Sequence, residues 1–120
     1  MFFIDTHCHL SDEAFSGEEE AYIARAAEAG VGMMLQPDVD STERKAMFDL
    51  CDRHPGTLRP MLGLYPGSVD GEWKEEIRKM LDYSGRPVVA IGEIGLDYHE
   101  GRAFEAQQKE ALDWQLDYAA

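Results

Sequence analysis

The sequence has 120 residues, of which 44% are hydrophobic and 10% aromatic, so it is long enough for one compact domain and too apolar to be intrinsically disordered. Its 24 acidic residues against 11 basic ones give a formal net charge of −13. A surface this acidic repels phosphate backbones and anionic lipids, which excludes general adhesion to nucleic acids or membranes. It does not exclude a phosphate bound at a metal site, because a bound cation dominates the charge around it.

The cysteine content and the first residues indicate a cellular compartment. Cys8 and Cys51 are too few and too far apart in the sequence to indicate a disulfide scaffold. The start of the chain lacks the charged region and the long apolar run of a signal peptide, and no segment is long enough to span a bilayer. We therefore expect a reduced, cytoplasmic protein that does not associate with membranes.

Short apolar runs alternate four times with helical patterns along the chain, each run preceding one helical pattern. The expected strands, in chain order, are residues 2–6, 31–36, 58–64 and 88–91. The expected helices that follow them are residues 18–29, a segment that begins after Asp40 and Ser41, residues 71–83, and residue 102 to the end. Short strands that alternate with longer helices predict βαβ units with a parallel sheet.

The length of each unit suggests how the sheet is arranged. Four units of about 30 residues are half of the eight units, about 250 residues in all, of a TIM barrel. The last helical pattern reaches Ala120 without a Gly or Pro stop signal. We therefore expect an α/β chain with the first four βα units of a TIM-type barrel, a half barrel over residues 1–120 without an internal boundary. A complete small flavodoxin-like domain is the alternative architecture.

His7 and His9 stand on either side of Cys8, directly after the first expected strand. Because alternate residues of a strand share a face, Asp5, His7 and His9 are expected on one face. The residues expected on the opposite face, toward the covering helices, are Ile4, Thr6, Cys8 and Leu10. Two imidazoles two residues apart can bind one cation, and Asp5 can orient an imidazole or neutralise charge behind it. The alternative is a pair of hydrogen-bonded core histidines.

A carboxylate follows the fourth expected strand. The alternation predicts that Val89, Ile91 and Glu93 share a face, with Glu93 at the C-terminal end of the strand. TIM barrels carry their chemistry at these ends, where the histidines are also expected. An isolated buried carboxylate is costly, so without a cation Glu93 would need hydrogen bonds or a raised pKa. The alternative to a cation is an ion pair with an arginine or lysine, such as Arg59 or Arg86.

These two segments carry a family resemblance. The stretches IDTHCHL at residues 4–10 and AIGEIGLDY at residues 90–98 resemble the opening and central signatures of the TatD family of metal-dependent hydrolases. Residues 107–119 also resemble the Gln- and Leu-rich helix that follows the central signature in that family. The resemblance implies a TIM barrel of the amidohydrolase-like type and an Mg-dependent deoxyribonuclease or phosphodiester hydrolase.

The resemblance also implies roles for particular residues. His7, His9 and Glu93 are implied to be metal ligands, with Glu93 bridging two divalent cations. The family uses two further histidines and a late aspartate, which stand beyond Ala120, so we expect the isolated half to be a poor enzyme. Tyr65 stands where many members carry a histidine; it is a candidate contact for a substrate phosphate or a ring that covers the barrel rim.

Several alternatives stay open from the sequence. Polymerase-and-histidinol-phosphatase-type metal phosphoesterases also open with a His-x-His pair, although the segment around Glu93 favours the TatD family. A non-catalytic half barrel could instead act structurally, because its two open sheet edges invite self-association or pairing with the missing half. Carboxylates suit Mg²⁺ or Mn²⁺ and imidazoles suit Zn²⁺, so the metal is undetermined. The substrate can be DNA, a nucleotide or another small ester.

Overall fold

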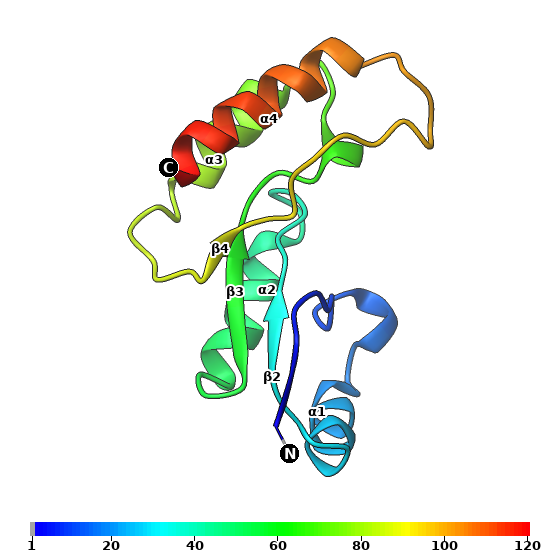
Figure 1. Ribbon diagram of the computed structural model, residues 1–120, viewed down its shortest axis with the longest axis vertical. Helices are drawn as coiled ribbons and strands as arrows, with labels where there is room; N and C mark the ends of the chain where they lie inside the picture. Colours follow the sequence, from blue (N-terminus) through cyan, green and yellow to red (C-terminus); the bar gives the residue numbers. More distant parts are fainter. Residues whose placement is uncertain (1) are drawn as a thin grey trace.

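A computed structural model describes residues 2–120 as parallel strands that alternate with helices (Figure 1). The strands are β1 (Phe3–Asp5), β2 (Val31–Gln36), β3 (Leu58–Leu62) and β4 (Ala90–Ile91). The α-helices are α1 (Glu19–Glu28), α2 (Arg44–Arg53), α3 (Trp73–Leu81) and α4 (Glu105–Ala119). Two short 3₁₀ helices, η1 (Glu13–Phe15) and η2 (Pro66–Ser68), lie in the loops after β1 and β3.

The sheet has the strand order β1-β2-β3-β4, with every neighbouring pair parallel. A flavodoxin-like sheet places its first strand between later ones, so this sequential order rules out that alternative. Consecutive parallel strands that curl with helices between them are the arrangement of a TIM barrel. The predicted half barrel is therefore confirmed, and the C-terminal ends of its strands meet along one edge.

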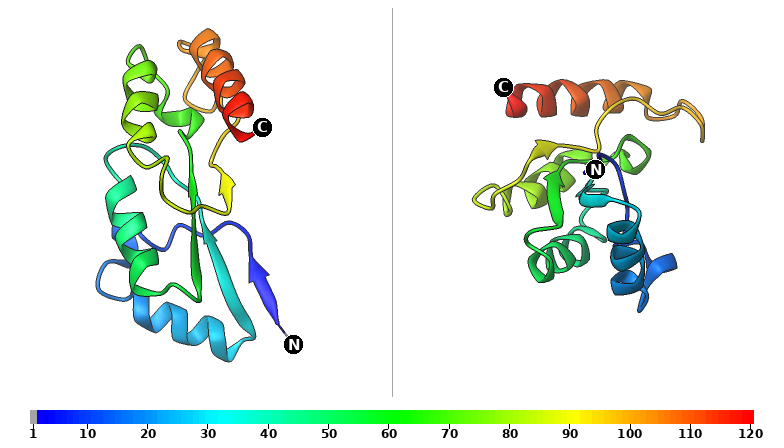
Figure 2. Two further views of the ribbon diagram at one scale, coloured as in Figure 1. Left: turned by 90° about the vertical axis from the view of Figure 1, so that its left-hand side faces the viewer. Right: turned by 60° about the horizontal axis from the view of Figure 1, so that its bottom comes forward.

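Helices α1 and α2 lie on one side of the strands, and α4 crosses the far end of the molecule beside α3 and β4 (Figure 2). The core between α2 and the sheet is apolar, with Phe48, Leu58 and Leu62 at most 1% exposed. Gly30 ends α1 with a φ of 92°, a conformation that glycine adopts without a steric penalty. No helix among residues 2–120 has both the length and the apolar character needed to cross a membrane.

Three strands are shorter than the sequence predicts, and of these β3 ends at Leu62 rather than at residue 64. β1 ends at Asp5, so the alternation expected to continue to Leu10 is wrong. Leu10 is buried as expected, but Ile4, expected toward the helices, is 49% exposed because β1 is an edge strand. β4 contains only Ala90 and Ile91, so the strand alternation does not reach Glu93.

The last helix also starts later than predicted. Helix α4 begins at Glu105 rather than at residue 102. The residues just before it form a turn in which Arg102 donates to the Glu105 carboxylate at 3.2 Å. The helical spacing of the sequence extends through this turn, and the pattern alone does not mark the boundary.

Candidate metal centre

Three side chains meet at the C-terminal ends of β1 and β4. Nε2 of His7 lies 3.1 Å from Nε2 of His9, and these two atoms lie 3.3 and 3.2 Å from Oε2 of Glu93. The side chain of His7 is 53% exposed, whereas those of His9 and Glu93 are 34% and 28% exposed. The three groups thus form one triangle of ligand-type atoms that is partly open to solvent.

The two histidines reach this point from a loop and not from a strand. The Asp5 carboxylate accepts a hydrogen bond from the backbone N–H of His7 at 3.0 Å, which turns the chain directly after β1. The backbone N–H of Cys8 donates to Leu35 O at 3.1 Å and keeps the loop against β2. The two imidazoles then meet edge to face, with centroids 4.9 Å apart. Asp5 therefore contacts the main chain of His7, whereas the sequence suggested a contact with an imidazole.

Glu93 is held by the loop that follows β2. The backbone N–H of Asp38 donates to Gly92 O at 3.0 Å, and the backbone N–H of Glu93 donates to Asp38 O at 3.1 Å. The peptide bond between Gly92 and Glu93 is cis. The sequence also suggested Arg86 as a partner for Glu93. Arg86 instead pairs with Asp52, so that suggestion is wrong.

The triangle fits a divalent cation on both distance and chemistry. Ligand atoms about 2.1 Å from one cation lie roughly 3.0–3.4 Å from each other at coordination angles of 90–109°. The three separations of 3.1, 3.2 and 3.3 Å fall in that range. Two imidazole nitrogens and one carboxylate oxygen are a donor set that Zn²⁺ and other transition metals accept. The assignment of His7, His9 and Glu93 as metal ligands stays a prediction.

A cavity of about 430 Å³ opens over the triangle. Besides the triangle, its wall includes Asp12, Glu43 and Tyr65, and none of its described lining residues is Lys or Arg. Burial raises the pKa of Glu43, and the carboxylates of Asp40 and Asp12 raise it further. This wall is therefore negative and attracts a cation more readily than a bare phosphate.

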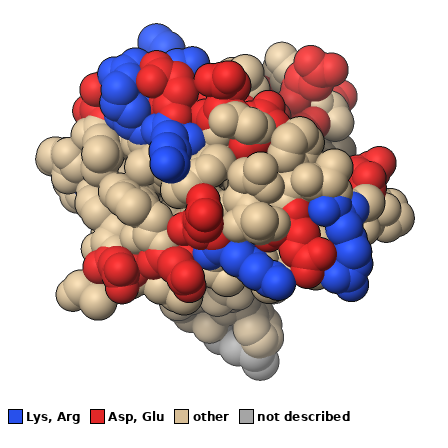
Figure 3. Space-filling view, turned by 90° about the horizontal axis from the view of Figure 1, so that it is seen from above, with Lys and Arg blue, Asp and Glu red and all other residues tan. Residues whose placement is uncertain are grey.

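The outer surface is less uniform than this cavity. Seen from above, over the end that carries α3 and α4, acidic and basic side chains lie next to each other (Figure 3). Helices α3 and α4 each carry an ion pair between side chains of the same helix, Arg78 with Glu75 and Lys109 with Glu105. Pairing of this kind neutralises part of the positive charge that a phosphate backbone would meet on this face.

Tyr65 lies at the rim between this cavity and a second hollow of about 710 Å³. Its hydroxyl donates to Asp97 Oδ2 at 2.9 Å, and the hydrogen bond raises the pKa of Tyr65. Asp97 also accepts from the backbone N–H of His99 at 2.9 Å, and these two bonds lower the pKa of Asp97. The contacts of Asp97 are those of a turn cap, whereas both roles suggested for Tyr65 stay predictions.

A buried ion pair beside the triangle is absent from the sequence predictions. Arg44 donates to the Asp38 carboxylate at 2.6 Å, and the two side chains are 2% and 0% exposed. The sequence does contain one signal, because Asp38 follows the end of β2 closely, as Glu93 follows the end of β4. Its partner Arg44 carries no such signal, since it is the first residue of α2 and charged residues usually lie on the exposed face of a helix.

Residues 4–120 match the model of the family described as TatD related DNase. An uncharacterized metal-dependent hydrolase of Escherichia coli K12, YjjV, is 39% identical over 119 residues, which are 96% of this chain and 44% of YjjV. A 3'-5' ssDNA/RNA exonuclease TatD of Pantoea ananatis is 32% identical over 118 residues, 97% of this chain and 45% of that protein.

Solved structures agree with this similarity. The crystal structure of the Escherichia coli YjjV protein superimposes with a TM-score of 0.87 at 38% sequence identity, covering 98% of this chain and 46% of that one. A TatD-family hydrolase of Entamoeba histolytica superimposes with a TM-score of 0.75 at 22% identity, which supports the fold. The chain therefore spans less than half the length of the relatives it matches.

Proposed function

The chain belongs to the family of TatD related DNases, and from this membership we propose that the protein it forms part of is a divalent-metal-dependent hydrolase of phosphodiester bonds, with DNA as the substrate. Relatives are named as a metal-dependent hydrolase and as a 3'-5' ssDNA/RNA exonuclease, which supports both the metal and the bond type. The observation that carries the proposal is the triangle of His7, His9 and Glu93, whose ligand atoms lie within 3.3 Å of each other.

Each side chain of the triangle has a defined task in this proposal. For His7 and His9 to bind a cation through Nε2, each ring must carry its proton on Nδ1. Glu93 adds a negative oxygen that neutralises part of the cation charge, and its position between the two rings suits a shared ligand. A bound divalent cation supplies Lewis-acid polarisation of a phosphoryl oxygen and activation of water for hydrolysis.

Residues around the triangle bind and orient in this scheme. Asp5 holds the main chain of His7 through a 3.0 Å hydrogen bond and so fixes the direction of the first imidazole. Tyr65 at the cavity rim offers a hydroxyl to a substrate phosphate, for which it must exchange its hydrogen bond with Asp97. The absence of lysine and arginine from the described cavity wall leaves the cations as the phosphate-binding charges.

The complete protein is proposed to hold two divalent cations, as the family resemblance implies. One carboxylate and two imidazoles do not fill the coordination of two cations, and the family resemblance implies that two further histidines and an aspartate beyond Ala120 complete it. The ion is proposed to be Mg²⁺, Mn²⁺ or Zn²⁺, because the mixed donor set accepts both harder and softer cations. A cytoplasmic location stays a prediction.

Metal content by elemental analysis tests the proposal directly. The complete protein is expected to bind divalent metal stoichiometrically, and the His7→Ala, His9→Ala double variant is expected to lose at least one ion. His54→Ala is the matched control, because His54 pairs with Glu20 at the C-terminal end of α2. Cleavage of single-stranded DNA is then measured for all three proteins. Full metal content and full activity in the double variant would contradict the proposal.

An assembly role is the second candidate, supported by the exposed edge of the sheet. Phe3 and Ile4 on edge strand β1 are 51% and 49% exposed. An apolar edge of this kind pairs readily with another strand, either in a second copy or in the remainder of a barrel. Sedimentation of the 120-residue chain separates the possibilities: a stable monomer opposes self-association, and metal binding by that monomer opposes a purely structural role.

A further inference from the structure

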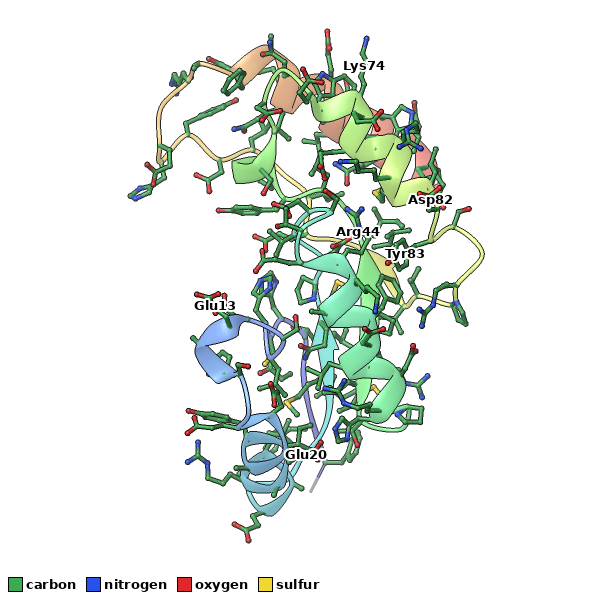
Figure 4. All side chains as sticks on the ribbon, turned by 180° about the vertical axis from the view of Figure 1, so that it is seen from behind. Glu13, Glu20, Arg44, Lys74, Asp82 and Tyr83 are labelled. Atoms are coloured by element: carbon green, nitrogen blue, oxygen red, sulfur yellow. The ribbon has the colours of Figure 1, made fainter. Side chains whose placement is uncertain are left out.

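A buried ion pair lies directly behind the proposed metal centre. Nε of Arg44 is 2.6 Å from Oδ2 of Asp38, and the residues are 2% and 1% exposed. Arg44 is the first residue of α2 and lies in the middle of the molecule, where this helix meets the strand ends (Figure 4). Burying two charges is costly even when they are paired, so such a pair is weak evidence for a stabilising role alone.

The Asp38 carboxylate is fixed from three directions. Besides Arg44, the backbone N–H of Gly63 donates to Oδ2 at 3.1 Å, and the backbone N–H of Val39 donates to Oδ1 at 2.9 Å. Arg44 also reaches the carbonyl oxygen of Gly63 at 3.4 Å. Burial raises the pKa of Asp38 to about 6, against the opposing effect of the Arg44 charge. The side chain therefore ties the loop after β2 to the loop after β3.

The backbone of the same residue holds the loop after β4. Asp38 N–H donates to Gly92 O at 3.0 Å, and Asp38 O accepts from Glu93 N–H at 3.1 Å. Both polar groups of the Gly92–Glu93 peptide are thus bound by a single residue. A shift of the Asp38 main chain would therefore displace the Gly92–Glu93 peptide or break these two hydrogen bonds.

We propose that Asp38 and Arg44 are a positioning pair, whose task is to hold the carboxylate of Glu93 against the imidazoles of His7 and His9. The inference rests on the proposed function, because Glu93 is a metal ligand only in that scheme. The chain of contacts runs from the Arg44 guanidinium to the Asp38 carboxylate, and from the Asp38 backbone to the Glu93 peptide. Metal sites lose affinity when the groups that orient their ligands are removed, typically 10- to 100-fold.

A purely structural role makes a different prediction from a positioning role. Replacing both members of a buried ion pair by apolar residues often leaves stability unchanged or improves it. The Asp38→Leu, Arg44→Met double variant therefore keeps the buried volume filled while it removes the bonds to Gly63 and Val39. The double variant also leaves the buried backbone N–H of Gly63 without an acceptor, which costs about 1–3 kcal/mol. A structural pair therefore predicts a change in stability with unchanged metal binding, whereas a positioning pair predicts weaker metal binding.

The experiment compares the complete protein with this double variant and with Leu50→Ala. Leu50 is a buried apolar residue of α2, 2% exposed, so its truncation destabilises the same helix and leaves the hydrogen bonds of the Asp38 carboxylate in place. Urea unfolding, metal affinity by calorimetry and a crystal structure are obtained for each. The double variant is expected to bind metal at least tenfold more weakly, with Glu93 Oε2 moved out of hydrogen-bond reach of His9, now 3.2 Å away. Leu50→Ala is expected to keep the affinity of the parent.

Two outcomes overturn the positioning proposal: Glu93 keeps its place in the double variant, or Leu50→Ala weakens metal binding as much. If the double variant does not fold, Arg44→Lys replaces it, because lysine keeps the charge but lacks the planar fork. Several-fold weaker metal binding at an unchanged urea midpoint supports the proposal, and unchanged affinity overturns it. If the parent protein binds no metal, the proposed function fails, and the position of Glu93 in the variant still decides whether the pair positions it.

Discussion

Substituting Gly63 by alanine tests whether the loops after β3 and β4 are as tightly packed as their geometry indicates. A Cβ built on Gly63 lies 2.7 Å from the carbonyl carbon of Gly92 and 2.8 Å from its oxygen. Carbon atoms in favourable contact are about 3.5–4.0 Å apart, so the two loops must separate by roughly 1 Å. The neighbouring atoms belong to the backbone and not to a flexible side chain, so no rotamer change relieves the contact.

The expected cost follows from two opposing effects. Inserting a methyl group into a packed site costs about 1–3 kcal/mol, because the surrounding backbone has to shift. Replacing glycine by alanine also restricts the unfolded chain, which stabilises the folded state by about 0.4–1 kcal/mol. The clash is the larger effect, so Gly63→Ala should lower the free energy of unfolding by about 1–2 kcal/mol. Since Gly92 precedes Glu93, the same shift should weaken metal binding.

Urea unfolding of the complete protein measures this cost, with Gly56→Ala as the matched control. A Cβ on Gly56 meets no atom within 4 Å, so that variant should unfold at the parent midpoint or slightly above it. The reasoning is refuted if Gly63→Ala unfolds at the parent midpoint. It is also refuted if Gly56→Ala loses as much stability, because the loss then reflects a general intolerance of these loops and not the contact with Gly92.

Two further predictions concern buried groups. Gln115→Leu should lower the free energy of unfolding by about 1–3 kcal/mol, because the buried N–H of Leu64, now 2.7 Å from Gln115 Oε1, loses its acceptor. Urea titration measures the loss, with a leucine substitution at the partly exposed Gln107 as the control. Equal losses in the two variants would contradict the explanation. Burial raises the pKa of Cys51 from 9.0 to about 12, so near pH 8 the thiolate fraction in the folded protein is about a thousandfold lower than in the protein unfolded by urea. The measurement uses a Cys8→Ala variant, so that labelling reports on Cys51 and not on Cys8. Labelling with a thiolate-selective reagent should be correspondingly slow, and rapid labelling of the folded protein would show that the thiol is accessible.

The fold was predictable because its signals are periodic and local. Short apolar runs such as residues 31–36 and the glycine that ends α1 mark elements that the structure contains, and β2 has the predicted bounds. The strand ends were less predictable. The alternation around His7 continues through Leu10, yet Asp5 turns the chain by accepting a hydrogen bond from the His7 backbone. This contact depends on loop geometry, which side-chain periodicity does not encode.

The same distinction applies to the candidate site. His7, His9 and Glu93 are polar residues at strand ends, and the rule that parallel strands end at one edge was enough to expect them together. Arg44 and Gln115 had no comparable signal, because each lies within a helical pattern and acts on a loop from another part of the chain. Their partners are 6 and 51 residues away, and such pairs become visible only when the packing is known.

Buried polar side chains recur behind each loop of the candidate site. Gln36 accepts from the backbone N–H of Leu10 after β1, and Asp38 accepts from that of Gly63 after β3. In the same way, two glutamines of α4 hold later loops: Gln115 accepts from Leu64 N–H and Gln108 from Asp97 N–H. An apolar side chain in place of Gln36, Asp38 or Gln115 would leave a buried amide without a partner, at a cost of about 1–3 kcal/mol. The short strands therefore set the topology, whereas the buried carboxylate and amide side chains determine where the ends of those strands place His7, His9 and Glu93.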